Sequence, residues 1–345
     1  MQPKILVLLT GGTICSTEDE NGSRFSNVEN VRIIEHFRQS ESEYANAVDF
    51  DRLAPLDVLS ENMTLDTWNR LLDCFRSEID WTAYKGIVVL HGTDTLAYTA
   101  ALLSIVLAGT PIPVCLVSSQ LPLHHAQTNG HANFRVAVEL ILNGIKPNVY
   151  AVYRNMDGTM YLHYGAHLLQ CASYSNDFFS GDEVMLPDKA CAAFEGVAYQ
   201  TKEPLLFNLS ALASTVLKIT PYVGMDYSRI FLDGVHAIVI ETYHSESVCV
   251  ERSRGIGSYS GASILSLLDR CKEAGIPLFL APCSEDAYCY ESTRDAILKE
   301  AASLYGMTAE MAYVKLLVGC ALGYQKDDLV GFAKKSINFE QFLSM

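Results

Sequence analysis

Short, continuous apolar runs alternate with amphipathic stretches along most of the chain. Residues 5–9, 86–90 and 114–117 are such runs, typical of strands that are covered on both faces of a parallel sheet. Between the first two, residues 63–79 place their leucines and aromatic residues on one helical face, with Thr64 as the N-cap. This alternation predicts an α/β fold with a doubly wound, mostly parallel sheet.

The same pattern continues through the chain. It predicts strands at residues 237–240 and 277–281, and helices at residues 95–108, 133–142, 263–274, 292–305 and 308–322. Gly109 and Gly275 stand where two of these helices should end. Residues 15–30 are polar, and we interpret them as a loop long enough to form a lid over a site.

The alternation breaks down between Pro187 and Pro204. We therefore predict an N-terminal catalytic α/β domain at residues 1–187 and a linker at residues 188–208. Residues 209–345 would form a second, smaller α/β domain. For the last 15 residues, 331–345, the pattern predicts no element.

Composition narrows the class of protein. The chain has 345 residues, 49% of them hydrophobic, which is enough to bury a large core. Only 19% are charged, the net charge is −15, and Lys and Arg form no basic run. A nucleic-acid backbone would be repelled, so we expect no nucleic-acid partner.

The ten cysteines contain no Cys-x-x-Cys unit, and many lie in apolar runs. We interpret them as reduced, buried thiols of a cytoplasmic protein, and we expect neither a zinc site nor another metal site. Residues 1–4 lead directly into the first strand, without the apolar segment of a signal peptide. We expect no membrane association.

Threonine-rich loops follow two of the buried strands. Residues 10–13 read Thr-Gly-Gly-Thr, and residues 91–95 read His-Gly-Thr-Asp-Thr. Strand ends of an open α/β sheet form its ligand crevice, and a Gly-Gly turn lets backbone N–H groups approach a ligand. There the Thr13 hydroxyl could attack a carbonyl while N–H groups hold the oxyanion. A plain turn remains an alternative for the first loop, and helix capping by Thr93 or Asp94 for the second.

These two segments resemble the signature segments of the bacterial-type L-asparaginase family, in its cytosolic, type I-like branch. Other segments are similar to that family in the same order along the chain. They are residues 59–64 (Leu-Ser-Glu-Asn-Met-Thr), 117–123 (Val-Ser-Ser-Gln-Leu-Pro-Leu), 239–243 (Val-Ile-Glu-Thr-Tyr) and 307–310 (Met-Thr-Ala-Glu).

The resemblance implies a set of roles. Thr13 would be the nucleophile that forms an acyl-enzyme, and Thr93 with Asp94 would assist proton transfer. The substrate-binding residues would be Gly12, Ser60, Glu61, Gly92 and Ser119. Ser60 would bind the substrate α-carboxylate, and Glu61 with Asp94 its α-ammonium. No cofactor is implied, and family members form homodimers or homotetramers.

The chain departs from this pattern at several positions, among them those of a lysine and a tyrosine. The family carries a lysine before an Asp-x-Phe sequence, but no lysine occurs between Lys146 and Lys189, and Gln170 or Cys171 stands near the expected place. The family also has a tyrosine in the lid, whereas residues 14–30 contain none. Because a hydroxyl is a poor nucleophile without a base, His163 or His167 is the most natural substitute. More distant candidates are Tyr44 and Lys189.

We therefore expect an amidohydrolase that converts L-asparagine and water to L-aspartate and ammonia. One alternative is a catalytically weak or inactive amino-acid-binding relative. Another is an amidase for a different small amide, such as glutamine or a β-aspartyl compound. A third is a subunit that supplies ammonia to a partner, which would usually carry an added N-terminal module, whereas the first strand here begins at residue 5.

Overall fold

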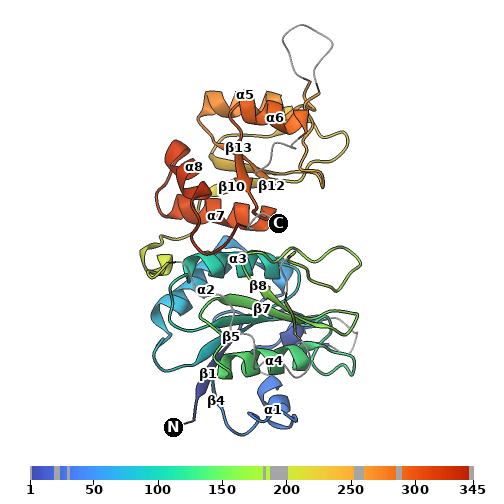
Figure 1. Ribbon diagram of the computed structural model, residues 1–345, viewed down its shortest axis with the longest axis vertical. Coiled ribbons are helices and arrows are strands. Elements are labelled where there is room, and N and C mark those ends of the chain that lie inside the picture. The colour runs from blue at the N-terminus through green and yellow to red at the C-terminus, as the bar shows by residue number, and fades with distance from the viewer. Residues whose placement is uncertain are drawn as a thin grey trace. The chain divides into compact units, whose positions relative to one another are not determined.

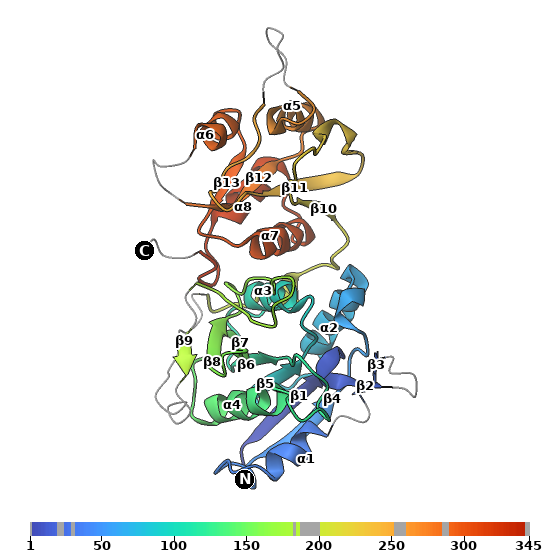
Figure 2. The same cartoon turned by 90° about the vertical axis from the view of Figure 1, so that its right-hand side faces the viewer.

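The computed structural model describes residues 2–18, 24–28, 32–181, 184–186, 201–251, 260–284 and 290–341. The chain divides into two compact units, Met1–Asn208 and Leu209–Met345. Each unit is built on one sheet, with helices on both faces (Figures 1 and 2). The fold class predicted from the sequence is thereby confirmed.

The sheet of the first unit has the strand order β4-β1-β5-β6-β7-β8-β9. Its strands are β1 (Lys4–Leu9), β4 (Asp49–Leu53), β5 (Gly86–Leu90), β6 (Val114–Val117), β7 (Val149–Arg154), β8 (Met160–Tyr164) and β9 (Val184–Leu186). The pairs from β4 to β7 are parallel, whereas β8 and β9 are antiparallel. The chain leaves β1 toward β4 and leaves β5 toward β6, so the strand order reverses between β1 and β5. Ligands of open α/β sheets bind beyond the carboxyl ends of strands at such a point.

Helices cover both faces of this sheet. α1 (Ile33–Arg38) and α4 (Gly130–Leu142) lie on one face, and α2 (Leu65–Ser77) and α3 (Leu96–Val106) on the other (Figures 1 and 2). Residues of α1 and α4, such as Phe37 and Phe134, share a core with Leu9, Leu90 and Val117 at the strand ends. The strand ends that carry the two threonine loops are therefore anchored in a fully packed core.

The second unit has four parallel strands in the order of the chain. They are β10 (Thr215–Ile219), β11 (Val235–Glu241), β12 (Leu278–Cys283) and β13 (Ala302–Tyr305). α5 (Ile264–Ala274) and α6 (Glu291–Leu298) cover one face, and α7 (Ala309–Ala321) covers the other, followed by α8 (Lys326–Lys334) (Figure 2). Short 3-10 helices complete both units: η1 (Thr13–Cys15), η3 (Ser60–Asn62), η5 (Leu205–Asn208) and η6 (Tyr227–Arg229).

Local signals predicted several helix ends correctly. Thr64 caps α2, and Thr67 completes a capping box with it. Ser263 caps α5, which ends at Gly275 in the left-handed conformation, with φ of 69°. α4 starts at Gly130, three residues earlier than its apolar pattern predicts.

Other expectations were wrong or incomplete. The segment predicted to be a loop contains a hairpin of β2 (Ser16–Glu18) and β3 (Arg24–Ser26). The helix expected at residues 292–305 ends at Leu298, because Glu300 takes a positive φ of 75° and the following residues join the parallel sheet as β13. The sequence pattern predicted none of the elements α1, β4, β7, β8, β9, β10 and α8.

The predicted linker stays a prediction, since residues 187–200 lie outside the described residues. Its last residues form η5 in the first unit, where the Arg76 guanidinium donates to the carbonyl of Leu206 at 3.2 Å.

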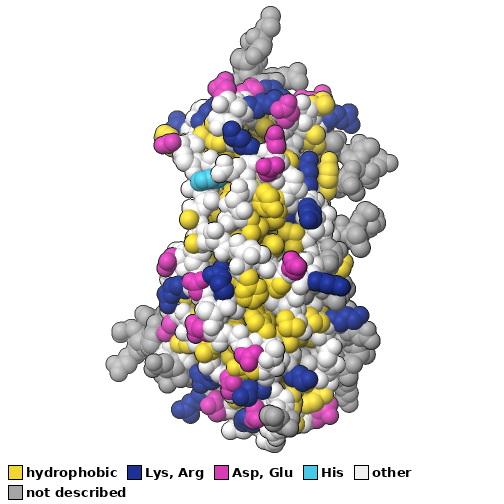
Figure 3. All heavy atoms as spheres, turned by 90° about the vertical axis from the view of Figure 1, so that its left-hand side faces the viewer, with side chains coloured by type: hydrophobic (Ala, Val, Ile, Leu, Met, Phe, Trp, Pro, Cys, Tyr) yellow, Lys and Arg dark blue, Asp and Glu magenta, His cyan; other side chains and the backbone are white. Residues whose placement is uncertain are grey.

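On the face shown in Figure 3, Lys and Arg side chains are interspersed with Asp and Glu. No helix in the described parts of the chain combines the length and the apolar character that a membrane span requires.

Candidate active site

The first threonine loop is fixed by backbone hydrogen bonds on both sides. Thr10 N–H donates to the carbonyl of Leu90 at 3.1 Å, and Gly12 N–H donates to that of Val58 at 2.8 Å. Gly11 and Gly12 have φ of 105° and 77°, which only glycine adopts without strain. Thr13 follows directly, half-buried, as the first residue of η1. Because its N–H is engaged with Val58, Gly12 contributes close approach rather than a free donor.

The second loop joins β5 to α3. Thr93 is half-buried and Asp94 is exposed, ahead of Thr95 at the N-cap position. Thr95 makes no side-chain capping bond, and its hydroxyl donates instead to the carbonyl of Ser60 at 2.9 Å. The hydroxyl nearest the helix therefore ties two loops together rather than capping α3.

The two loops touch each other through their glycines. A Cβ atom on Gly12 would lie 2.2 Å from Cα of Gly92, closer than any real carbon contact. A Cβ atom on Gly92 would lie 2.4 Å from Oγ of Ser60. Both positions therefore require glycine. The residues after them, Thr13 and Thr93, start from backbones in direct contact at the reversal point between β1 and β5.

Ser60 connects the second loop to a third segment. Its Oγ accepts a hydrogen bond from Asp94 N–H at 3.2 Å and lies 3.4 Å from Oδ2 of Asp94. Ser60 is buried at the start of η3, and Glu61 follows it in an exposed position. The structure thus brings Ser60 to Asp94.

Ser119 lies two residues beyond β6, the strand next to β5. Its side chain is fully buried, and its hydroxyl donates to the carbonyl of Leu121 at 2.7 Å. Ser119 lies at the same edge of the sheet as the two loops, but its hydroxyl donates its hydrogen bond within its own turn.

The segment that departs from the asparaginase pattern reaches the second loop through Gln170. Its side-chain amide donates to the backbone carbonyl of Asp94. The neighbouring Cys171 thiol lies 3.3 Å from the carbonyl oxygens of Ser175 and Asp177. Burial raises the pKa of this thiol, and the charges of Asp177 and Asp94 add to the shift. Gln170 and Cys171 therefore stand beside Asp94, as the sequence position suggested.

The other proposed substitutes occupy separate places. The buried ring of His163 on β8 bonds through Nδ1 to Oγ of Ser180 at 3.0 Å. The hydroxyl of Tyr44 bonds to Asn143 at the C-terminal end of α4, which lies at the opposite edge of a parallel sheet from the threonine loops. Lys189 lies outside the described residues.

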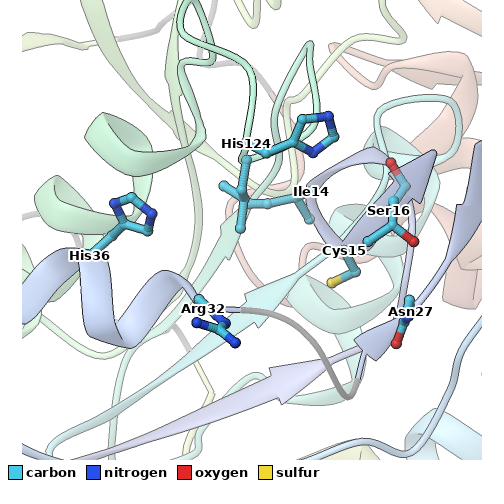
Figure 4. Close-up of a pocket in the computed structure, with 9 residues that line it drawn as sticks. Ile14, Cys15, Ser16, Asn27, Arg32, His36 and His124 are labelled. Atoms are coloured by element: carbon cyan, nitrogen blue, oxygen red, sulfur yellow. The ribbon is translucent and has the colours of Figure 1, made fainter.

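A pocket of about 160 Å³ adjoins the first loop (Figure 4). Ile14, Cys15 and Ser16 of η1 and β2 line one side, and Arg32 and His36 reach it from the start of α1. None of the eight residues predicted from the sequence to form the site is among its lining residues. Burial raises the pKa of the Cys15 thiol to about 12, so this thiol stays protonated.

The described ionisable side chains and cysteines indicate neither a metal site nor a disulfide. Within the described residues, His, Cys, Asp and Glu side chains form no group of three or more that could hold a metal ion. None of the described cysteines takes part in a disulfide, and Cys191 and Cys289 lie outside the described residues.

The two threonine loops are thus joined through their glycines at the reversal point of an open α/β sheet. The family model for the N-terminal domain of asparaginase matches residues 4–187, more than half of the chain. The chain therefore belongs to the asparaginase family.

Similarity to individual relatives supports this family assignment. The chain is 27% identical over 338 residues to an L-asparaginase of Thermococcus kodakarensis, with 94% of each chain covered. It is also 27% identical over 324 residues to a glutamyl-tRNA(Gln) amidotransferase subunit of Methanosarcina acetivorans, covering 91% of this chain and 73% of the relative.

Solved structures show the same fold. The thermostable L-asparaginase of Thermococcus kodakarensis superposes with a TM-score of 0.73 at 24% identity, over 99% of this chain and all of that chain. L-asparaginase I of Vibrio cholerae gives 0.71 at 20% identity, with the same coverage.

Proposed function

We propose that the protein hydrolyses L-asparagine to L-aspartate and ammonia through an acyl-enzyme on Thr13. The observation that carries the proposal is the contact between Gly12 and Gly92, which joins the backbones from which Thr13 and Thr93 start. Two hydroxyls on touching loops at a sheet reversal point suit the attack on one small carbonyl substrate.

The reaction proceeds in two balanced halves. Oγ of Thr13 bonds to the side-chain amide carbon while its proton passes to the Thr93–Asp94 group, and backbone N–H groups stabilise the oxyanion. The carbon–nitrogen bond then breaks, and the nitrogen leaves as ammonia with that proton. Water attacks the resulting ester, which releases aspartate and restores the Thr13 hydroxyl.

The remaining residues bind the amino-acid end of the substrate in this proposal. The Ser60 hydroxyl holds the α-carboxylate, Glu61 and Asp94 face the α-ammonium, and Ser119 lies beside the scissile amide. The exposure of Asp94 and its contact with Ser60 support this division, because one edge can then meet both charged groups of an amino acid.

Gln170 distinguishes this site from one that contains a lysine. A neutral amide accepts no proton at ordinary pH, so Gln170 can orient the Asp94 loop but cannot act as the base. Loss of general-base assistance typically lowers the rate by about 10²–10⁴. We therefore propose an enzyme that is slow with asparagine unless another group supplies the base.

The direct test is ammonia release from asparagine, glutamine and a β-aspartyl amide by the wild type, Thr13→Ala and Thr93→Val. We expect Thr13→Ala to abolish release and to leave no acyl-enzyme detectable by mass spectrometry. Full activity in Thr13→Ala would remove the nucleophile from the proposal. Calorimetry with aspartate separates this case from an inactive relative, which would bind tightly and release no ammonia.

A second candidate function has its own support. The similarity to a glutamyl-tRNA(Gln) amidotransferase subunit suggests a chain that supplies ammonia to a partner protein. Ammonia release from glutamine rather than asparagine, stimulated by an added amidotransferase partner, would favour it over the first proposal.

We further propose that the protein acts in the cytoplasm as a homodimer or homotetramer. Sedimentation velocity over a range of concentrations tests the assembly. A monomer at all concentrations would contradict it.

A further inference from the structure

A buried histidine is the first residue of the second threonine loop. The His91 side chain is fully buried, and its Nδ1 lies 2.8 Å from the carbonyl oxygen of Gly92. Because a carbonyl oxygen only accepts hydrogen bonds, Nδ1 carries the proton and the ring is the neutral Nδ1–H tautomer. Burial lowers its pKa to about 4, opposed by the bond to Gly92, which keeps the ring neutral at ordinary pH.

The other ring nitrogen has a different environment. Nε2 of His91 is buried and has no hydrogen-bond partner among the described residues. In this tautomer Nε2 is an acceptor, and leaving it unpaired has a cost in free energy. Among the described residues, the polar contact that holds this ring is therefore the one to Gly92.

That contact sets the direction of a peptide group. In a trans peptide the C=O and the N–H point in opposite directions, so a Gly92 carbonyl turned to the buried ring directs Thr93 N–H the other way. Gly92 is also the residue that packs against Gly12 and against Oγ of Ser60. A small rotation of this peptide would move the start of Thr93 relative to both other loops.

We propose that His91 is a positioning residue for the hydrolysis, whose Nδ1–H holds the Gly92 carbonyl and thereby fixes the orientation of Thr93. This inference rests on the proposed function in giving Thr93 a role in the reaction. His91 itself neither touches the substrate nor exchanges a proton during turnover.

Two substitutions separate the two ring nitrogens. The side-chain amide nitrogen of His91→Asn can occupy roughly the place of Nδ1, whereas that of His91→Gln reaches toward Nε2. We expect His91→Asn to keep kcat within about threefold of wild type and His91→Gln to lose about 10²-fold, the effect of a displacement near 1 Å at a reacting group.

The comparison of these two variants distinguishes a positioning role of His91 from a purely structural role. Both variants lose the packing of the imidazole, so a purely structural role would lower the melting temperature of both and leave their kcat values alike. Equal kcat values in the two folded variants, or a better kcat in His91→Gln than in His91→Asn, would overturn the proposal.

A measurement of the ring tautomer in the wild-type protein does not depend on activity. Ring ¹⁵N chemical shifts report the tautomer of each histidine. The ring signals of His91 are identified as those that disappear in His91→Asn, or by specific labelling. We expect Nδ1–H between pH 5.5 and 8, whereas an Nε2–H ring would overturn the inference. If wild type releases no ammonia from any amide, the proposed function fails, and the tautomer alone still decides whether His91 holds Gly92.

Discussion

Gly12 and Gly92 touch backbone to backbone, with no room for a side chain on either residue. Gly12 lies in the loop after β1 and Gly92 in the loop after β5, the two strands between which the strand order reverses. The contact makes the two threonine loops one structural feature, although 80 residues separate them in the chain.

Replacing Gly12 by alanine should therefore abolish amide hydrolysis and destabilise the first unit. The new Cβ would collide with Gly92 backbone atoms, which cannot move aside as a flexible side chain can. Gly12 has φ of 77° and ψ of −175°, a region that is essentially restricted to glycine, and a side chain there adds about 1–3 kcal/mol of strain. Urea unfolding followed by the fluorescence of Trp68 and Trp81, together with ammonia release, measures both effects.

Gly144→Ala is the matched control. Gly144 has φ of 80°, close to the 77° of Gly12, but nothing lies within 4 Å of an added Cβ. It should show the cost of a side chain at a positive φ without a steric collision, and it should keep its activity. An active, stable Gly12→Ala protein would contradict the contact.

Gln170→Lys should raise kcat. The ammonium group can still donate to the carbonyl of Asp94, and a lysine that loses its proton can serve as a base, which glutamine cannot. A gain of up to about 10² is the lower end of the range for general acid–base assistance. Steady-state kinetics at several pH values would show the gain together with a new ionisation.

Gln170→Met serves as its control, since it keeps the length of the side chain without a donor. It should lower kcat below wild type, because the Asp94 loop loses its hydrogen bond. If Gln170→Lys and Gln170→Met behave alike, the amide does not occupy a functional position.

The stability of the protein should fall on acidification partly because of His91. Its pKa is about 4 in the folded state against 6.5 for an ordinary histidine, so the unfolded chain binds more protons between these values. Stability therefore decreases as the pH falls from 6.5 toward 4, by about 3 kcal/mol in total. Carboxyl groups titrate in the same range, so the quantity to measure is the difference between wild type and His91→Asn in urea titrations at pH 7 and 4.5. Parallel pH curves for the two proteins would mean that His91 is not buried in its neutral form.

The sequence predicted the parts of the fold that depend on local signals. The short apolar runs before Thr10 and His91 favour strands with both faces covered, and Thr64 and Ser263 are capping residues with a local mechanism. In the sequence, β13 is indistinguishable from the end of a helix, because its four residues, Ala-Ser-Leu-Tyr, fit either element and only pairing with β12 decides between them. The formation of β8 and of the edge strand β9 likewise depends on pairing with antiparallel partners.

The sequence offers candidate site residues but not the contacts among them. Thr13, Thr93 and Asp94 come from recognisable loops, whereas the contact of Gly12 with Gly92 depends on the strand order, which one sequence does not reveal. The hydrogen bond from Gln170 to Asp94 joins two residues that lie 76 positions apart in the sequence. His91 carries a usable signal, since a histidine at the end of a buried strand must find a polar partner or remain neutral.

A last prediction concerns Lys315 and Glu340, which form an ion pair with both side chains fully buried. Lys315 on α7 also donates to the carbonyl of Lys335, and Glu340 accepts the N–H groups of Ile337 and Asn338 at 2.9 and 2.7 Å. Lys315→Met leaves the carboxylate buried without its cation, which typically costs about 3–5 kcal/mol.

Adding Glu340→Gln to Lys315→Met should recover most of this loss, because the uncompensated charge disappears while an acceptor for the two N–H groups remains. Both tryptophans lie in the first unit, so hydrogen exchange of peptides covering residues 309–341 is the suitable measurement. Faster exchange in Lys315→Met and near-normal exchange in the double variant would establish the coupling. Simple addition of the two single effects would show that the pair does not hold residues 337–340 to α7.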